Sequence, residues 1–317
     1  MVGEFDIIRR FFTRPAKRAI LGVGDDAALI AIPPDIELAV STDMLLEGRH
    51  FFANADPRQL GHKALAVNLS DMAAMGAEPR WVTLALALPK ADEHWLEAFS
   101  CGFSELAHAH QVELIGGDTC RGALTLCVQI MGEVPKGEAL RRDGAKAGED
   151  IWVSGKLGDA ALTLAHLKKQ LTLSMEELAR CSPALHTPTP RVALGKSLRG
   201  IATSAIDISD GLMSDLKHVL ERSQVGAVIE LEKIPGSDIL NRQPPEIARN
   251  ALLSGGDDYE LCFTAKPRER EKIDALSRQL ELSLTCIGRT KGSRGLTLLD
   301  ERGRALDYKA QGFDHFG

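Results

Sequence analysis

The sequence contains no run of basic residues. Its 38 Lys and Arg residues are outnumbered by 44 Asp and Glu residues, and the net charge is −6. Proteins that bind nucleic acid usually concentrate positive charge in one region. We therefore expect no nucleic-acid partner, and we expect bound cations to neutralise part of the acidity.

Long apolar runs and paired cysteine motifs are also missing. The apolar stretch from Trp81 to Pro89 is far too short to span a bilayer. The N-terminal residues lack the basic-then-apolar layout of a secretion signal. None of the 6 cysteines forms a Cys-x-x-Cys pair, and scattered thiols are typical of a reducing compartment. We predict a cytoplasmic protein with no membrane partner.

The sequence does contain a series of short acidic motifs, most of them bordered by segments rich in Val, Ile and Leu. They are Gly24-Asp25-Asp26, Ser41-Thr42-Asp43, Asn68-Leu69-Ser70-Asp71, Gly116-Gly117-Asp118-Thr119, Asp207-Ile208-Ser209-Asp210-Gly211 and Gly255-Gly256-Asp257-Asp258. A single Gly-Asp pair is an ordinary turn. Oxygen ligands from distant segments are what Mg²⁺ requires, and bound Mg²⁺ often holds polyphosphate. The whole series therefore suggests a metal–phosphate site.

Apolar periodicity predicts alternating helices and strands in both halves of the chain. The expected helices are 4–12, 57–76, 92–110, 158–169 and 212–222. The expected strands are 38–40, 81–88, 113–115, 124–133, 151–153, 204–208 and 228–231. A further strand should lead into the turn at 22–26, and the proline-containing stretch 182–190 should be a loop.

The segment from Pro135 to Asp150 is polar, charged and contains glycine, which is typical of a domain boundary. We place the boundary between residues 140 and 141. The prediction is an α/β fold of the α+β type with two domains, residues 1–140 and 141–317.

Asp71 gives the sharpest single signal. It lies in a predicted helix that has few polar positions. An unpaired carboxylate in such surroundings would carry a large desolvation penalty. We therefore favour metal binding over the alternative, a solvent-facing Asp beside Lys63 or Asn68.

Two other motifs are placed at the ends of predicted strands. Ser41-Thr42-Asp43 should end a buried strand, where two hydroxyls and a carboxylate suit Mg²⁺ and its waters. Taken alone, this motif is better explained by capping of the strand end. Gly116-Gly117-Asp118-Thr119 should follow a strand, so that its glycines let backbone N–H groups approach phosphate.

The remaining motifs have open alternatives. Asp207 and Asp210, between a strand and a helix, favour metal, although Ser209 or Asp210 could cap the helix instead. Residues 22–27 fit the loose G-x-G-x-x-A dinucleotide pattern. The dinucleotide interpretation fails on charge, because Asp25 and Asp26 would direct two carboxylates at a pyrophosphate, whereas a cation between them would reverse this argument. A plain tight turn explains residues 22–27 equally well.

Taken together, the ordered motifs resemble the thiamine-monophosphate kinase family, which lies in the aminoimidazole-ribonucleotide-synthetase-like superfamily. The resemblance runs from Gly3-Glu4-Phe5 to the closing residues 312–316. It implies an N-terminal domain that binds ATP and Mg²⁺ and pairs its sheet with a second subunit, and a C-terminal α/β domain. It also implies a homodimer that transfers a phosphoryl group from ATP to thiamine monophosphate, with several Mg²⁺ ions.

The same resemblance implies a set of site residues. The expected Mg²⁺ ligands are Asp26, Ser41, Thr42, Asp43, Asp71, Asp118, Asp207 and Asp210. The expected ATP contacts are Gly117, Asp118, Arg142 and Ser209. The expected thiamine-phosphate contacts are His50, Asp257 and either Tyr308 or Phe313. No general base is expected, because the acceptor phosphate is already anionic near neutral pH.

Two other functions stay open at this point. One is another ATP-dependent enzyme of the superfamily, similar to aminoimidazole ribonucleotide synthetase. The other is a non-catalytic nucleotide-binding regulator. The large number of carboxylates argues against a regulator, since binding alone would hardly need so many.

Overall fold

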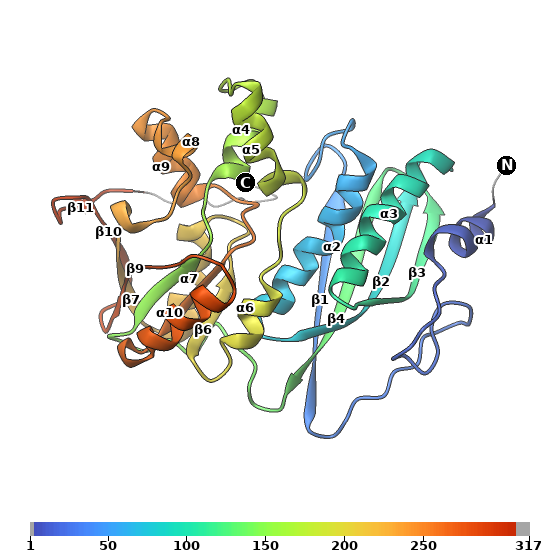
Figure 1. Cartoon of the computed structure of the whole chain (residues 1–317), viewed down its shortest axis with the longest axis horizontal. Helices are drawn as coiled ribbons and strands as arrows, with labels where there is room; N and C mark the ends of the chain where they lie inside the picture. Colours follow the sequence, from blue (N-terminus) through green and yellow to red (C-terminus); the bar gives the residue numbers. More distant parts are fainter. Residues whose placement is uncertain (1–2, 309–317) are drawn as a thin grey trace. The chain divides into compact units, whose positions relative to one another are not determined.

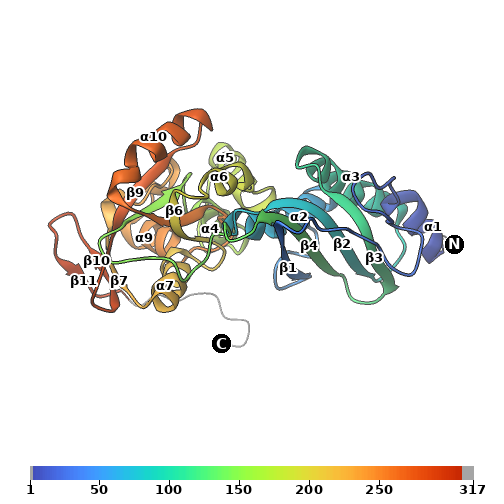
Figure 2. The ribbon, with the colours of Figure 1, turned by 90° about the horizontal axis from the view of Figure 1, so that it is seen from below.

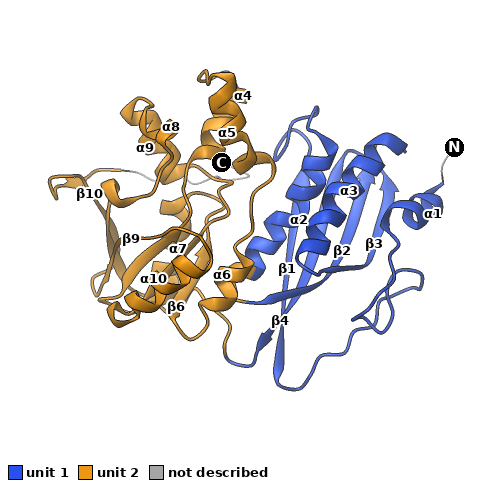
Figure 3. Cartoon of the chain, in the orientation of Figure 1, with its two compact units in different colours: residues 1–72, 77–137 blue, residues 73–76, 138–317 orange. Residues whose placement is uncertain are grey.

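The computed structural model describes residues 3–308, which fall into two compact units (Figure 3). Unit 1 comprises residues 1–72 and 77–137, and unit 2 comprises residues 73–76 and 138–317. None of the helices in the described part of the chain combines the length and apolarity needed to cross a bilayer.

Unit 1 is built on a four-stranded sheet in the order β1-β4-β2-β3. The strands are β1 (Ile36–Leu46), β2 (Glu78–Leu88), β3 (Glu113–Arg121) and β4 (Thr125–Pro135). Strand β4 is antiparallel to both neighbours, whereas β2 and β3 are parallel. A parallel pair needs a long crossover, and helix α3 (Glu93–Ala109) provides it.

Helices α2 (Pro57–Ala74) and α3 lie on one face of this sheet and bury its core (Figures 1 and 2). The side chain of Asp92 caps α3 by accepting the Trp95 backbone N–H at 3.2 Å. Phe99 and Phe103 of α3 and Leu65 of α2 are almost completely buried. A short N-terminal helix, α1 (Glu4–Ile7), continues as a π-helix from Ile8 to Phe12. Together they cover the helix predicted over 4–12.

The prediction of a buried strand at 38–40 is wrong in length and burial. Strand β1 runs from Ile36 to Leu46, and Leu38 and Val40 are 37% and 51% exposed. Alternate residues of a strand face opposite sides, and only the side with Leu45 is covered by helices. Met44 also lies on the open side and is 52% exposed. The open face of this edge strand is therefore mostly apolar, with Thr42 among its residues.

Unit 2 is built on a seven-stranded mixed sheet in the order β11-β10-β7-β9-β5-β8-β6. Its strands are β5 (Asp150–Ser154), β6 (Ala202–Asp207), β7 (Gly226–Glu230), β8 (Leu261–Ala265), β9 (Leu284–Lys291), β10 (Gly295–Leu299) and β11 (Ala305–Leu306). Its helices are α4 (Asp159–Leu167), α5 (Met175–His186), α6 (Val192–Ser197), α7 (Leu212–Ser223), α8 (Asp238–Asn241), α9 (Pro245–Ser254) and α10 (Arg270–Gln279). Leu212 and Leu216 of α7 and Ile206 of β6 belong to its buried core.

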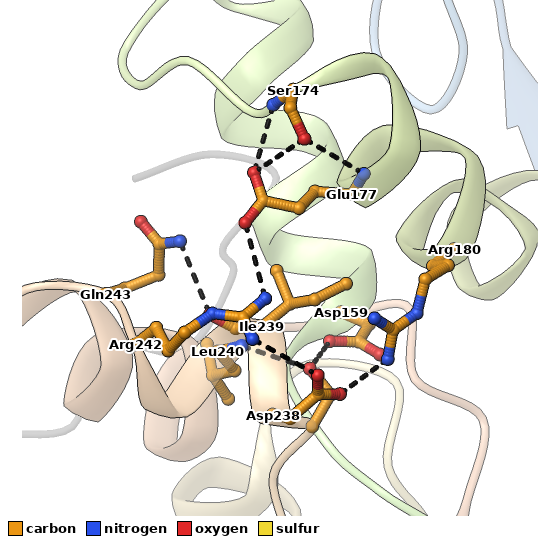
Figure 4. Close-up of polar contacts among 10 residues, drawn as sticks. Asp159, Ser174, Glu177, Arg180, Asp238, Ile239, Leu240, Arg242 and Gln243 are labelled. Atoms are coloured by element: carbon orange, nitrogen blue, oxygen red, sulfur yellow. Dashed lines mark hydrogen bonds and ion pairs between the residues drawn. The ribbon is translucent and has the colours of Figure 1, made fainter.

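The prediction of a loop over 182–190 is wrong for its first half. Residues 182–186 belong to α5, which starts with a capping box between Ser174 and Glu177 (Figure 4). Cys181 and Leu185 are buried on this helix, so packing outweighs the cost of Pro183 in its interior. The strand expected before the turn at 22–26 is also absent, because within that segment only isolated bridges form, such as Leu21 with Leu29.

Candidate active site

In unit 1 the fold brings together Ser41 of β1 and Asp71 of α2. The Ser41 Oγ donates a hydrogen bond to the Asp71 Oδ2 at 2.5 Å. Asp43 lies two residues further along β1 and therefore on the same face as Ser41. Thr42 lies on the opposite, open face with Val40 and Met44, so its side chain is directed away from Asp71.

Both strand-end motifs of unit 1 in fact lie inside strands. Ser41-Thr42-Asp43 is in the middle of β1, and Gly116-Gly117-Asp118-Thr119 is part of β3. Gly117 has a φ of 147°, and a Cβ there would lie 1.9 Å from the carbonyl oxygen of Leu84 on β2. The close approach of two parallel strands therefore requires glycine at this position, whatever it contacts in a ligand.

Three other predicted residues of unit 1 lie on segments other than those that carry the Ser41–Asp71 pair. Asp118 is exposed on β3, and the sheet order places β1 and β3 at opposite edges, roughly 14 Å apart at the usual strand spacing. Asp26 is exposed in an irregular segment, where its backbone N–H bonds to the Asp25 Oδ1 at 2.9 Å. The Nδ1 of His50 accepts the Leu46 backbone N–H at 3.0 Å and so closes the turn after β1.

In unit 2 the loop between β6 and α7 concentrates negative charge. Asp207 is buried at the end of β6, and Asp210 follows in the loop. Asp215, which the sequence interpretation missed, lies in the first turn of α7, and its Oδ2 accepts the backbone N–H groups of Ser209 and Asp210, both at 3.0 Å. Burial and the charges of Asp207 and Asp210 raise the pKa of Asp215 to about 7. Asp215 could have been recognised from the sequence as an acidic residue in the first turn of a predicted helix, where the helix dipole favours negative charge.

The raised pKa of Asp215 predicts a pH-dependent stability. Its folded-state pKa of about 7 lies above the ordinary 3.8, so the folded chain binds this proton more tightly than the unfolded chain. The resulting stabilisation is complete below the unfolded pKa and is lost as the pH rises through about 7. In metal-free buffer, the free energy of unfolding measured in urea should therefore fall for wild type, relative to Asp215→Asn, as the pH rises from about 5 to about 8. Parallel pH profiles of the two proteins would contradict this assignment.

The segment that follows α9 lies beside the same loop. The backbone N–H of Asp257 donates to the Ser209 carbonyl at 2.9 Å, so a predicted substrate contact and a predicted nucleotide contact are adjacent. The Tyr308 hydroxyl lies 2.9 Å from the Ser254 Oγ, near the start of this segment. Phe313, the alternative aromatic, lies outside the described residues.

Arg142 and Ser209, two predicted ATP contacts of unit 2, are not close together. The Arg142 carbonyl accepts the Ser223 Oγ at 2.8 Å, which ties its backbone to the last residue of α7. Ser209 precedes the first turn of the same helix. A helix of 12 residues is about 18 Å long, so Arg142 and Ser209 lie at opposite ends of α7.

The donor atoms of these clusters suit a magnesium ion. Ser41, Asp43 and Asp71 offer only oxygen, as do Asp207 and Asp210, and Mg²⁺ is usually held by one or two carboxylates together with waters and substrate phosphates. Among residues 3–308, no three His, Cys, Asp or Glu side chains gather closely enough to hold a metal ion by themselves. Metal binding by these residues stays a prediction.

Comparison with known proteins shows the family. The N-terminal domain model of AIR synthase related proteins matches residues 24–134, and the C-terminal domain model matches residues 146–301. Thiamine-monophosphate kinase of Escherichia coli (strain K12) is 47% identical over 99% of this chain and 98% of its own length. The chain belongs to the thiamine-monophosphate kinase family.

Solved structures of thiamine-monophosphate kinases have the same fold. The crystal structure of the enzyme from Stenotrophomonas maltophilia K279a is 45% identical, covers 95% of each chain and gives a TM-score of 0.86. AaThiL complexed with AMPPCP and TMP is 29% identical, covers 90% of this chain and 89% of its own, and gives a TM-score of 0.77. The predicted two-domain fold of the aminoimidazole-ribonucleotide-synthetase type is thus confirmed.

Proposed function

We propose that the protein transfers a phosphoryl group from ATP to thiamine monophosphate, giving thiamine diphosphate and ADP. The observation that carries the proposal is the 47% identity to the Escherichia coli thiamine-monophosphate kinase over 99% of the chain. The complex of AaThiL with AMPPCP and TMP supports it, because AMPPCP is an analogue of ATP.

The chemistry needs positioning and charge neutralisation more than proton transfer. The acceptor is a phosphate oxygen that is anionic near neutral pH, so no side chain has to remove a proton from it. We infer that Asp43 and Asp71, with the Ser41 hydroxyl, and Asp207 and Asp210 hold Mg²⁺. Bound Mg²⁺ supplies positive charge that offsets the repulsion between the two phosphate groups.

A second group of predicted residues binds the two substrates. We propose that Gly117, Asp118, Arg142 and Ser209 contact ATP. We propose that His50, Asp257 and either Tyr308 or Phe313 contact thiamine monophosphate. The adjacency of Asp257 and Ser209, joined by a backbone hydrogen bond of 2.9 Å, supports a shared site for both substrates.

We further propose that residues 1–140 bind ATP and Mg²⁺ and form a homodimer through the open face of their sheet. Val40 and Met44 on this face are 51% and 52% exposed, and each lies opposite an apolar partner on β4, Met131 and Cys127. An apolar sheet face of this kind is typical of an interaction surface. Light scattering on the purified chain tests the dimer, and a monomer at assay concentrations would contradict it.

We place the enzyme in the cytoplasm.

The activity itself is tested by incubating the purified chain with ATP, Mg²⁺ and thiamine monophosphate. We expect thiamine diphosphate and ADP in equal amounts on chromatography, and we expect EDTA to abolish both products until Mg²⁺ is restored in excess. If the chain binds ATP but forms no thiamine diphosphate, thiamine monophosphate is not its substrate. Turnover of the substrate of aminoimidazole ribonucleotide synthetase would then be assayed for that alternative. If neither substrate were turned over, the regulator alternative would be left.

A further inference from the structure

The three acidic residues between Gly255 and Leu261 have different partners. Both carboxylate oxygens of Asp258 accept the backbone N–H of Gly158, at 3.0 and 3.1 Å, at the N-terminus of α4. Glu260 is 5% exposed and binds the Arg191 guanidinium and the Ser154 hydroxyl. Asp258 and Glu260 therefore anchor this segment inside unit 2. Asp257 contacts, among its partners, a residue of the segment itself.

That contact is a hydrogen bond from the Tyr259 hydroxyl to the Asp257 Oδ1, with an oxygen–oxygen distance of 3.0 Å. Tyr259 is 9% exposed as a residue, so it is packed in the protein. The donor is thus fixed by packing, and the acceptor carboxylate is the one predicted to contact thiamine monophosphate.

The backbone adopts an unusual conformation on both sides of this contact. Asp257 and Tyr259 have φ values of 66° and 50°, a region that residues with a side chain rarely occupy and that costs free energy. Two backbone hydrogen bonds hold the segment there, from Asp257 N–H to the Ser209 carbonyl at 2.9 Å and from Tyr259 N–H to the Ile208 carbonyl at 2.8 Å. Strained residues of this kind tend to lie at ligand sites.

Gly256 shows how closely the two segments approach each other. A Cβ at this position would lie 2.4 Å from the carbonyl oxygen of Ser209. The side chain of Asp257 therefore starts from a backbone whose place beside Ser209 is set by contact. What the backbone leaves open is the rotation of the Asp257 carboxylate, and the Tyr259 hydroxyl restricts it.

We propose that Tyr259 is a positioning residue for thiamine monophosphate, acting through the carboxylate of Asp257. The inference rests on the proposed function. The thiazolium ring of thiamine carries a permanent positive charge, and a carboxylate held in one orientation binds a cationic group without losing rotational freedom on binding. Tyr259 itself does not touch the substrate in this assignment, and the nucleotide contacts are independent of its hydroxyl.

The test is Tyr259→Phe, which keeps the buried ring and removes the hydroxyl. We expect the KM for thiamine monophosphate to rise about tenfold, the size of a lost hydrogen bond to a charged group. The KM for ATP should stay near the wild-type value. Thr203→Val is a matched control, because it removes a hydroxyl that bonds to the Glu149 Oε2 at 2.7 Å elsewhere in unit 2. The control should change neither constant.

A double-mutant cycle with Asp257→Asn then decides whether Tyr259 acts through Asp257. Asp257→Asn should raise the same KM, and adding Tyr259→Phe to it should have little further effect. Losses that add in the double variant, or an equal rise in both KM values, would overturn the proposal. If Tyr259→Phe does not fold, an unchanged KM in Asp257→Asn alone would overturn it. Wild-type protein that makes no thiamine diphosphate would instead reject the proposed function.

Discussion

Replacing Asp71 by Asn should lower kcat by about 100-fold or more while changing the free energy of unfolding little. Removing one preorganised group that stabilises transition-state charge costs on the order of 10²–10³ in rate. The Asn side chain has the same shape, and its Oδ1 still accepts the hydrogen bond that Ser41 donates at 2.5 Å. Initial rates with thiamine monophosphate and urea unfolding of the same preparation measure the two quantities.

Asp92→Asn is the matched control for this substitution. It makes the same carboxyl-to-amide change in unit 1, at the N-cap of α3, where Asn caps a helix as well as Asp does. It should leave both kcat and stability near the wild-type values. If Asp71→Asn instead unfolds the protein and keeps full turnover per folded molecule, Asp71 is a structural residue and the metal prediction at this position fails.

The largest effect on stability is expected for Arg191→Ala. Arg191 binds the buried Glu260 carboxylate through its Nε at 2.7 Å and through a second nitrogen. The side chains of Arg191 and Glu260 are 22% and 7% exposed. Removing one partner of a buried ion pair leaves an uncompensated charge and costs about 3–5 kcal/mol. Thermal unfolding followed by circular dichroism should show Tm lowered by about 10 °C.

Arg180→Ala controls for the loss of an arginine from unit 2. Arg180 pairs with Asp238 at 2.6 Å on the surface, where both side chains are about half exposed (Figure 4). Exposed pairs of this kind contribute at most about 1 kcal/mol, so Tm should change little. Equal Tm values for Arg191→Ala and Arg180→Ala would mean that Ser154 and other groups suffice to hold Glu260.

Local sequence signals located many elements of the fold. The helices predicted at 57–76 and 92–110 agree with α2 and α3 to within two residues, because Pro57 starts the first and Asp92 caps the second. The predicted ends of strands were less accurate than those of the helices. Strand β1 continues through Ser41-Thr42-Asp43 and β3 continues through Gly116-Gly117, since cross-strand hydrogen bonds from β4 and β2 extend them past polar and glycine residues that local propensity would exclude.

By itself the sequence determined the family, the two-domain α/β class and the acidic residues that carry the proposed site. The order of motifs along a chain can be compared without knowing where those motifs lie in space. The tertiary structure alone decided which of them meet. Ser41 reaches Asp71 across 30 positions of sequence, and Tyr259 reaches Asp257 through a backbone that Ser209 holds. These contacts depend on sheet order, helix packing and hydrogen bonds between distant segments, which no local pattern of residues encodes.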